Sequence, residues 1–152
     1  MAQIDQRIGH ALGEFGAGLV CSHTGGAVPR TRPFRVNYGI SERGVVDDVI
    51  AEVTAAAERA AALGVRRDGI LIDPTHDFGK NTYHGLSLLR HVKELVNTGW
   101  PVLMALSNKD FVGETLGVGL TERLEGTSLK VVSVREPGST RLGWQVREWL
   151  KR

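Results

Sequence analysis

The chain has 152 residues, a net charge of +2 and 41% hydrophobic residues, which fits one globular domain and excludes wholesale disorder. No apolar run is long enough to cross a membrane, the start lacks the apolar segment of a secretion signal, and the small positive charge gives no reason to expect binding to nucleic acid. We therefore expect a cytoplasmic protein. Its single cysteine, Cys21, lies within an apolar run and is interpreted as a small buried side chain.

Helix and strand patterns alternate along the sequence. Apolar residues at helical spacing predict a helix over residues 4–15, which two glycines end before a strand at residues 19–22. A second helix is predicted over residues 45–60, with Gly64 as its C-terminal cap, and a second strand over residues 70–72. A third helix is predicted over residues 86–96 and a third strand over residues 102–106.

Strands this uniformly apolar, separated by helices, are typical of parallel strands buried on both faces. The predicted fold class is therefore α/β. In such folds the loops that follow the strands form the ligand crevice, and here those loops carry the polar residues. We expect at least three parallel strands, with His23, Asp73 and Lys109 at the same end of the sheet.

Between residues 72 and 127, six short motifs follow one another in order: Ile72-Asp73-Pro74, Phe78-Gly79-Lys80, Leu88-Leu89, Pro101-Val102-Leu103, Ser107-Asn108-Lys109 and Glu-Arg-Leu-Glu-Gly-Thr at residues 122–127. Their order and spacing resemble dihydropteroate synthase. That family condenses 6-hydroxymethyl-7,8-dihydropterin pyrophosphate with p-aminobenzoate in folate biosynthesis. Its fold is a TIM-type (β/α)8 barrel, which typically needs roughly 250 residues.

The resemblance covers residues 1–127 and implies a partial barrel, about the last four β/α units, of a divergent second-copy type. The family's early asparagine, which helps to hold magnesium, has no counterpart here, so we expect no cofactor to be bound by this chain alone. Residues 128–152 carry six basic and two acidic side chains. They are interpreted as a divergent basic tail, either family sequence that has lost a helix or a frame-shifted end.

The same resemblance implies the candidate site. Asp73 would pair with the amino and NH edge of a pterin, because two carboxylate oxygens can face two donors. Lys109 would donate to the pterin carbonyl, and these two residues are the catalytic candidates. No metal ligand is expected. The other substrate-binding candidates, around the pterin and p-aminobenzoate, are Phe78, Gly79, Ser107 and Asn108.

Two departures from the family pattern bear on substrate binding. Thr75-His76-Asp77 stands where the family usually has Gly-x-Gly, and Asn108 stands where an arginine is usual. Asparagine lacks the charged fork with which an arginine binds anions. The protein is therefore expected to be truncated relative to the family, and weakly active or inactive by itself. An exposed barrel edge also favours a homodimer or higher association.

Two other functions remain open from the residues alone. One is a non-catalytic pterin-binding or interaction module. The other is a metal-dependent hydrolase, although no closely spaced pair of ligands fixes a geometry. Each site residue also has a structural interpretation: Asp73 as a turn cap, Lys109 as a solvated loop residue and Phe78 as a core plug. The metal candidates are His23, His76, Asp77 and His84.

Overall fold

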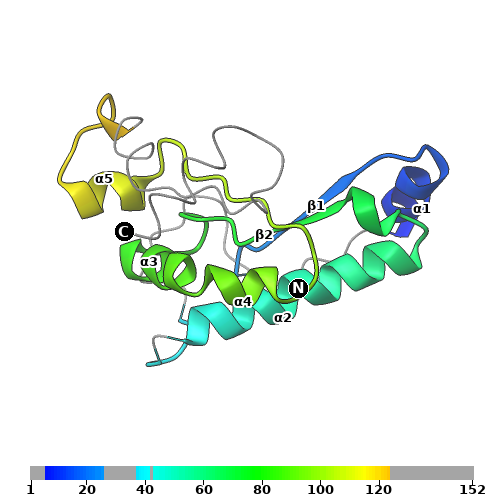
Figure 1. Ribbon diagram of the computed structural model, residues 1–152, viewed down its shortest axis with the longest axis horizontal. Helices are drawn as coiled ribbons and strands as arrows, with labels where there is room; N and C mark the ends of the chain where they lie inside the picture. The colour runs from blue at the N-terminus through cyan, green and yellow to red at the C-terminus, as the bar shows by residue number, and fades with distance from the viewer. Residues whose placement is uncertain (1–5, 26–36, 42, 124–152) are drawn as a thin grey trace, which may run out of the picture.

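The structure is a computed structural model and describes residues 6–25, 37–41 and 43–123. Helices and parallel strands alternate through this part of the chain (Figure 1), which confirms the α/β class. The boundary predicted at residues 127–128 and the basic tail lie outside the described residues. The elements are α1 (Gln6–Glu14), β1 (Leu19–Ser22), α2 (Gly44–Ala62), the 3-10 turn η2 (Arg67–Gly69), β2 (Ile70–Asp73), α3 (Thr82–Arg90), α4 (Val92–Val96) and α5 (Asp110–Leu116).

The sheet is built from β1 and β2, which pair in parallel from Leu19 with Ile70 to Ser22 with Asp73. The predicted third strand is present only as a single parallel bridge between Ile72 and Val102. The parallel direction of this pairing was predicted correctly, but the predicted length of the strand, residues 102–106, is wrong. The reason lies in β2, which ends at Asp73 before Pro74, a residue that has no N–H to continue a ladder.

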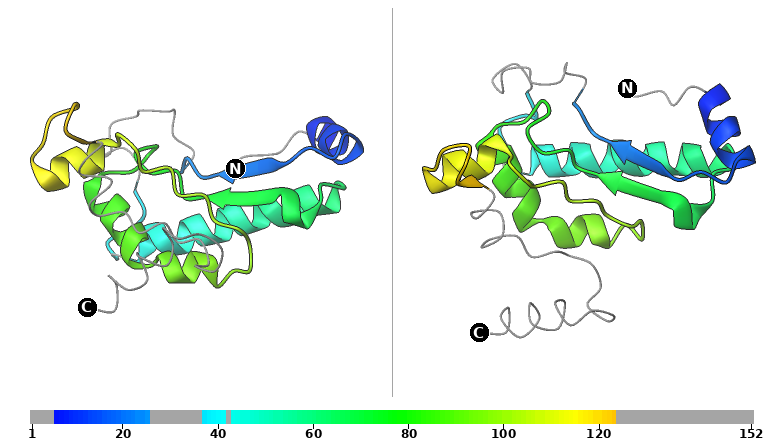
Figure 2. Two further views of the ribbon diagram at one scale, coloured as in Figure 1. Left: turned by 45° about the horizontal axis from the view of Figure 1, so that its top comes forward. Right: turned by 90° about the horizontal axis from the view of Figure 1, so that it is seen from above.

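Helix α2 supplies more buried apolar residues than any other element of the described part, and Figures 1 and 2 show it running along both strands. Its buried residues recur every three or four positions, so one face lies on the sheet. Gly64 has a φ of +99°, as its predicted role as a C-terminal cap requires, and Cys21 is buried as predicted. The buried residues of α2 are Val45, Val46, Val49, Val53, Ala56, Ala57 and Ala60.

The third predicted helix is two helices, α3 and α4, with a break at His91. The backbone N–H of His91 still donates to the Ser87 carbonyl at 3.1 Å, and its Nδ1 lies 2.8 Å from the same oxygen. This local side-chain bond competes with the regular helical pattern. Helix α3 also begins earlier than predicted, because Asn81 caps it: its side chain accepts from the backbone N–H of His84 at 2.9 Å.

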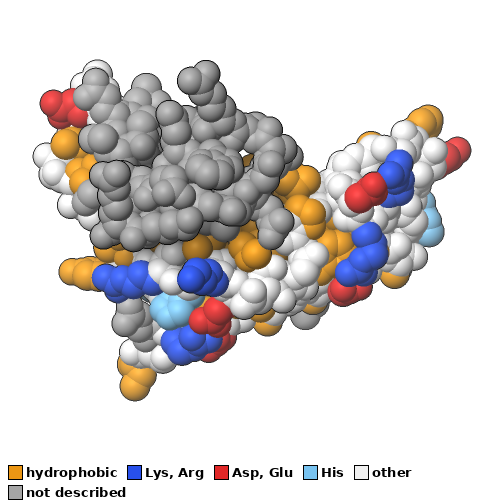
Figure 3. All heavy atoms as spheres, in the orientation of Figure 1, with side chains coloured by type: hydrophobic (Ala, Val, Ile, Leu, Met, Phe, Trp, Pro, Cys, Tyr) orange, Lys and Arg blue, Asp and Glu red, His pale blue; other side chains and the backbone are white. Residues whose placement is uncertain are grey.

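Helix α1 packs against the rest of the molecule through small residues. A Cβ at Gly13 would lie 2.8 Å from the backbone of Gly64, so only glycine permits this approach. Leu12 packs against the core, but Ile8 is 55% exposed and Phe15, just after the helix, is 81% exposed. Figure 3 shows apolar side chains open to solvent beside charged ones at this end. Within the described residues, no helix has the length and apolar character needed to span a bilayer.

Candidate functional site

The carboxyl ends of β1 and β2 meet, which brings the loops that follow them together. The backbone N–H of His23 donates to the carbonyl of Asp73 at 3.1 Å and to Oγ1 of Thr75 at 3.1 Å. Asp73 and His23 are therefore at the same end of the sheet, as predicted. Lys109 lies close enough for its positive charge to act on Asp73, so all three residues share one region of the molecule.

Asp73 is a buried carboxyl group, 6% exposed. Its Oδ1 accepts the backbone N–H of Thr75 at 2.8 Å, so the interpretation as a turn cap is confirmed. Burial raises the pKa of Asp73, while the Thr75 bond and the charges of Lys109 and Lys80 oppose that change. A carboxylate has about four lone-pair positions. The turn therefore leaves Asp73 further capacity to accept hydrogen bonds.

Lys109 and Phe78 form a pair beside Asp73. The Lys109 ammonium lies 4.9 Å from the centre of the Phe78 ring, within the range of a cation–π interaction. Phe78 is half-buried and belongs to neither of the core clusters formed by the described residues. The interpretation of Phe78 as a side chain that fills the core is therefore wrong. Its ring contacts the ammonium of Lys109 instead.

The other candidates are placed as follows. Gly79 is buried with a φ of +64°, and its carbonyl accepts the hydroxyl of Tyr38 at 3.0 Å. Ser107 and Asn108 are exposed. Asn108 has a φ of +57°, a conformation that asparagine tolerates better than most residues. The structure thus brings Asp73, Phe78 and Lys109 together and leaves two of the six candidates at the surface.

The loop after β2 holds two residues in the left-handed region where the family usually has glycine. Thr75 has a φ of +53° and Asp77 a φ of +67°, and for a β-branched residue this is an unusual conformation. Side-chain bonds offset the strain. Thr75 Oγ1 donates to the carbonyl of Asp73 at 3.0 Å, and the Asp77 carboxylate accepts the backbone N–H groups of Asp110 and Phe111. Asp77 therefore ties this loop to the start of α5.

Lys80 is a further residue of this region that the motif contained but that was not assigned a role. Its side chain is 3% exposed, and its ammonium donates to three backbone carbonyls. Burial lowers the pKa of Lys80 to about 8. The signal that could have pointed to Lys80 is its position in the Phe-Gly-Lys motif, in the loop that follows a buried strand.

The predicted metal set does not assemble. His76 is buried and stacks on Phe111 with ring centres 5.0 Å apart, Asp77 binds the start of α5, and His84 caps α3 with Asn81. Burial lowers the pKa of His76 to about 3, so its ring is neutral. These three side chains are used in packing and capping, which contradicts the hydrolase ligand set.

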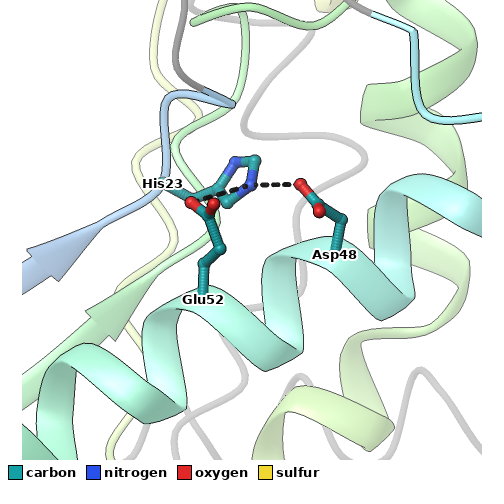
Figure 4. A group of neighbouring side chains, drawn as sticks. All are labelled: His23, Asp48 and Glu52. Carbon is teal, nitrogen blue, oxygen red and sulfur yellow. Dashed lines mark hydrogen bonds and ion pairs between the residues drawn. The ribbon is translucent and has the colours of Figure 1, made fainter. Parts of the chain in front are cut away.

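His23 instead faces two carboxylates of α2 that were not expected from the sequence. Its Nε2 lies 2.9 Å from Oδ2 of Asp48 and 3.6 Å from Oε2 of Glu52 (Figure 4). Within the described ranges this is the only group of three or more His, Cys, Asp or Glu side chains with metal-ligand spacing. The His23–Asp48 bond satisfies Nε2 of the buried ring without a metal ion, whereas Nδ1 is buried without a hydrogen-bond partner among the described residues. Nothing in the spacing of His23 along the sequence points to α2.

Comparison with known proteins decides the family. The model of the family described as "Pterin binding enzyme" matches residues 1–141 of this chain. The chain belongs to the pterin-binding enzyme family. The resemblance that the strand-end motifs carry is therefore confirmed.

Within this family the chain is similar to proteins named "Inactive dihydropteroate synthase 2". It is 78% identical to that of Mycobacterium leprae over 123 residues, which are 81% of this chain and 42% of the relative. For Mycobacterium tuberculosis (strain ATCC 25618 / H37Rv) the identity is 74% over 124 residues, 82% of this chain and 39% of the relative. The chain spans less than half the length of these curated relatives.

Solved structures give the same assignment of fold. The crystal structure of dihydropteroate synthase from Thermus thermophilus in complex with 4-aminobenzoate is similar with a TM-score of 0.73 and 35% identity. The similarity covers 83% of this chain and 49% of that chain. The predicted fold, a part of a TIM-type barrel with parallel strands, is therefore confirmed.

Proposed function

We propose that this chain binds a pterin at the ends of β1 and β2 and does not condense it with p-aminobenzoate by itself. The observation that carries the proposal is the group formed by buried Asp73 and by Lys109 over the ring of Phe78. A carboxylate matches the two adjacent donors of a pterin edge, and an ammonium matches its carbonyl. Membership of the pterin-binding family supports this assignment.

The lack of condensation follows from a missing contact to the leaving pyrophosphate. Asn108 stands where an arginine is usual, and asparagine lacks the charged fork with which an arginine binds anions. A charge-assisted contact to an anion contributes about 1.5–3 kcal/mol, and about 1.4 kcal/mol is tenfold in rate. Losing this contact would slow the reaction by about tenfold or more. The names of the inactive relatives are consistent with this proposal.

The proposal is tested by calorimetric titration of the protein with 6-hydroxymethylpterin and with p-aminobenzoate. We expect binding of the pterin, weakened about tenfold or more in Asp73→Asn and Lys109→Ala, because each change removes a charged hydrogen-bonding partner. Lys93→Ala, at an exposed position of α4, is the matched control. Pterin binding that neither site variant weakens would contradict the site, and dihydropteroate formation by the wild-type chain alone would contradict the lack of condensation.

The runner-up function is an interaction module without ligand. The exposed apolar side chains of the α1 end favour it, since a monomer rarely leaves large apolar groups open without a use. The two functions differ in the same titration, because a pure interaction module would bind no pterin at all.

A further inference from the structure

We propose that Lys80 is a positioning residue, whose single ammonium group locks the loops after β1 and β2 together and so orients Asp73 and Phe78 for ligand binding. This inference rests on the proposed function, since it concerns the same site. It assigns no contact with the ligand to Lys80 itself. Three features of the molecule carry it: the bonds of the ammonium, the residues those bonds hold, and the charge that they require.

The ammonium of Lys80 makes three hydrogen bonds, all to backbone carbonyls. The acceptors are the carbonyls of His23 at 3.1 Å, Thr75 at 3.2 Å and Phe78 at 3.0 Å. A lysine ammonium has three N–H donors and no acceptor. All its donors are therefore used inside the protein, and at 3% exposure the group has no surface to offer a ligand. Lys80 acts on the site through other residues.

Each of these carbonyls belongs to a residue that carries part of the site. The backbone N–H of Thr75 holds Oδ1 of Asp73 at 2.8 Å, and the ring of Phe78 supports the ammonium of Lys109. His23 follows β1, and its backbone N–H bonds to the loop after β2. One buried group thus fixes three points of two loops that are more than fifty residues apart in sequence.

The arrangement requires the charged form of Lys80. A neutral amine has two N–H groups and a lone pair, so one of the three carbonyl oxygens would face a lone pair instead of a donor. Burial lowers the pKa of Lys80 to about 8, and nearby carboxylates oppose this change. The titratable groups that act on Lys80 or respond to its charge are Asp73 and Asp77 after β2, Asp48 and Glu52 on α2, and the rings of His23, His76 and His84.

This charge requirement separates positioning from general stability. The native pKa of Lys80 lies below the ordinary value of 10.5, so between about pH 8 and that value the unfolded chain binds more protons than the native one. On account of Lys80, the free energy of unfolding therefore rises with pH in this window. The site should loosen in the same window. A merely structural lysine would not make ligand binding and stability change in opposite directions.

The test compares wild type, Lys80→Met and the surface control Lys93→Met, with 6-hydroxymethylpterin as the probe. Methionine keeps much of the apolar stem of lysine and removes the three donors. We expect Lys80→Met to fold, to weaken pterin binding at neutral pH by about tenfold or more, and to lack the loss of affinity that wild type shows above about pH 8. Titration of the pterin itself is common to all three proteins, so the difference between their pH profiles isolates Lys80.

Amide hydrogen exchange gives a readout that does not need the ligand. We expect Lys80→Met to exchange faster at residues 22–25 and 74–79, with the protection of α2 unchanged. If the variant fails to fold, wild type is measured across pH 8, where the same segments should exchange faster than the intrinsic rate predicts. Unchanged exchange in these segments would overturn the positioning role, as would unaltered pterin affinity in Lys80→Met. If wild type binds no pterin but the exchange changes, the proposed function fails and the locking of the loops stands.

Discussion

The loop after β2 and helix α1 lie at different ends of the sheet and are held in opposite ways. In the loop, polar side chains make the contacts: Asp77 binds the start of α5 and Lys80 binds three carbonyls. Helix α1 is held by a close backbone approach at Gly13, while Phe15 beside it is exposed. The position of the loop therefore depends on side-chain hydrogen bonds, and the position of α1 depends on close packing of the backbone. The two regions should respond to different kinds of substitution.

The largest expected effect is on α1. In Gly13→Val the new Cβ would stand 2.8 Å from the Gly64 backbone, which cannot move aside like a flexible side chain. Overpacking of this kind typically costs about 1–3 kcal/mol, and we expect the free energy of unfolding in urea to fall by that amount. His10→Ala, at an exposed position of the same helix, is the control. A Gly13→Val protein as stable as wild type would show that α1 is not held by shape.

The next largest effect is expected in the loop after β2. Two substitutions of Asp77 separate the contribution of its hydrogen bonds from that of its backbone conformation. Asp77→Ala removes the carboxylate that caps α5 and keeps a side chain at a φ of +67°, so we expect a loss of about 0.5–2 kcal/mol in the free energy of unfolding. Asp77→Gly removes the same bonds but relieves the strained conformation. It should be about 1 kcal/mol more stable than Asp77→Ala. Equal stability of the two variants would mean that the positive φ carries no strain.

The pH dependence of the site gives a smaller effect with a definite sign. Burial raises the pKa of Asp73, so just above the ordinary value of 3.8 the native state binds more protons than the unfolded state. On this account, the free energy of unfolding falls as pH rises through that window. Asp73→Asn keeps an acceptor for Thr75 and removes the buried charge. We expect it to be more stable than wild type at neutral pH and to lack this slope in urea unfolding, while it binds pterin less well.

The smallest effect on stability comes from Phe15. Because 81% of its surface is exposed, Phe15→Ser should change the free energy of unfolding by less than about 0.5 kcal/mol. Its effect should appear in association instead, as a shift toward the monomer in native mass measurement. A wild-type protein that is a stable monomer would contradict the predicted homodimer or higher association.

Prediction from sequence succeeded where the structure depends on a repeated pattern. The apolar spacing of α2 and the apolar run of β2 were sufficient, because burial of one face or both faces follows from periodicity alone. For β1 the pairing was predicted correctly but burial on both faces was wrong: Cys21 is buried, whereas Val20 is 42% exposed. The break at His91 depends on one side-chain bond to Ser87, and the short third strand on where β2 stops. Both features depend on a bond or a pairing with another part of the chain, which the residue pattern of one segment does not show.

For the candidate site, too, the sequence predicts some residues and misses others. A family motif names Asp73, Phe78 and Lys109 as candidates, and the structure brings them together, while their roles stay predictions. The partners Asp48 and Glu52 of His23 were missed, because they lie on a helix whose spacing indicates only a solvated polar face. The sequence does not reveal a role for Lys80, because its three acceptors are backbone atoms, and sequence letters do not show where backbone carbonyls point.

The contact between Gly13 and Gly64 also limits how this sequence can vary. Any side chain at position 13 meets the backbone of residue 64, and position 64 has a φ of +99°, which side chains rarely adopt. The two glycines are thus restricted for different reasons, one by space and one by conformation. In a library of random substitutions, both positions should therefore tolerate far fewer residue types than exposed neighbours such as His10, although neither lies near the proposed pterin site.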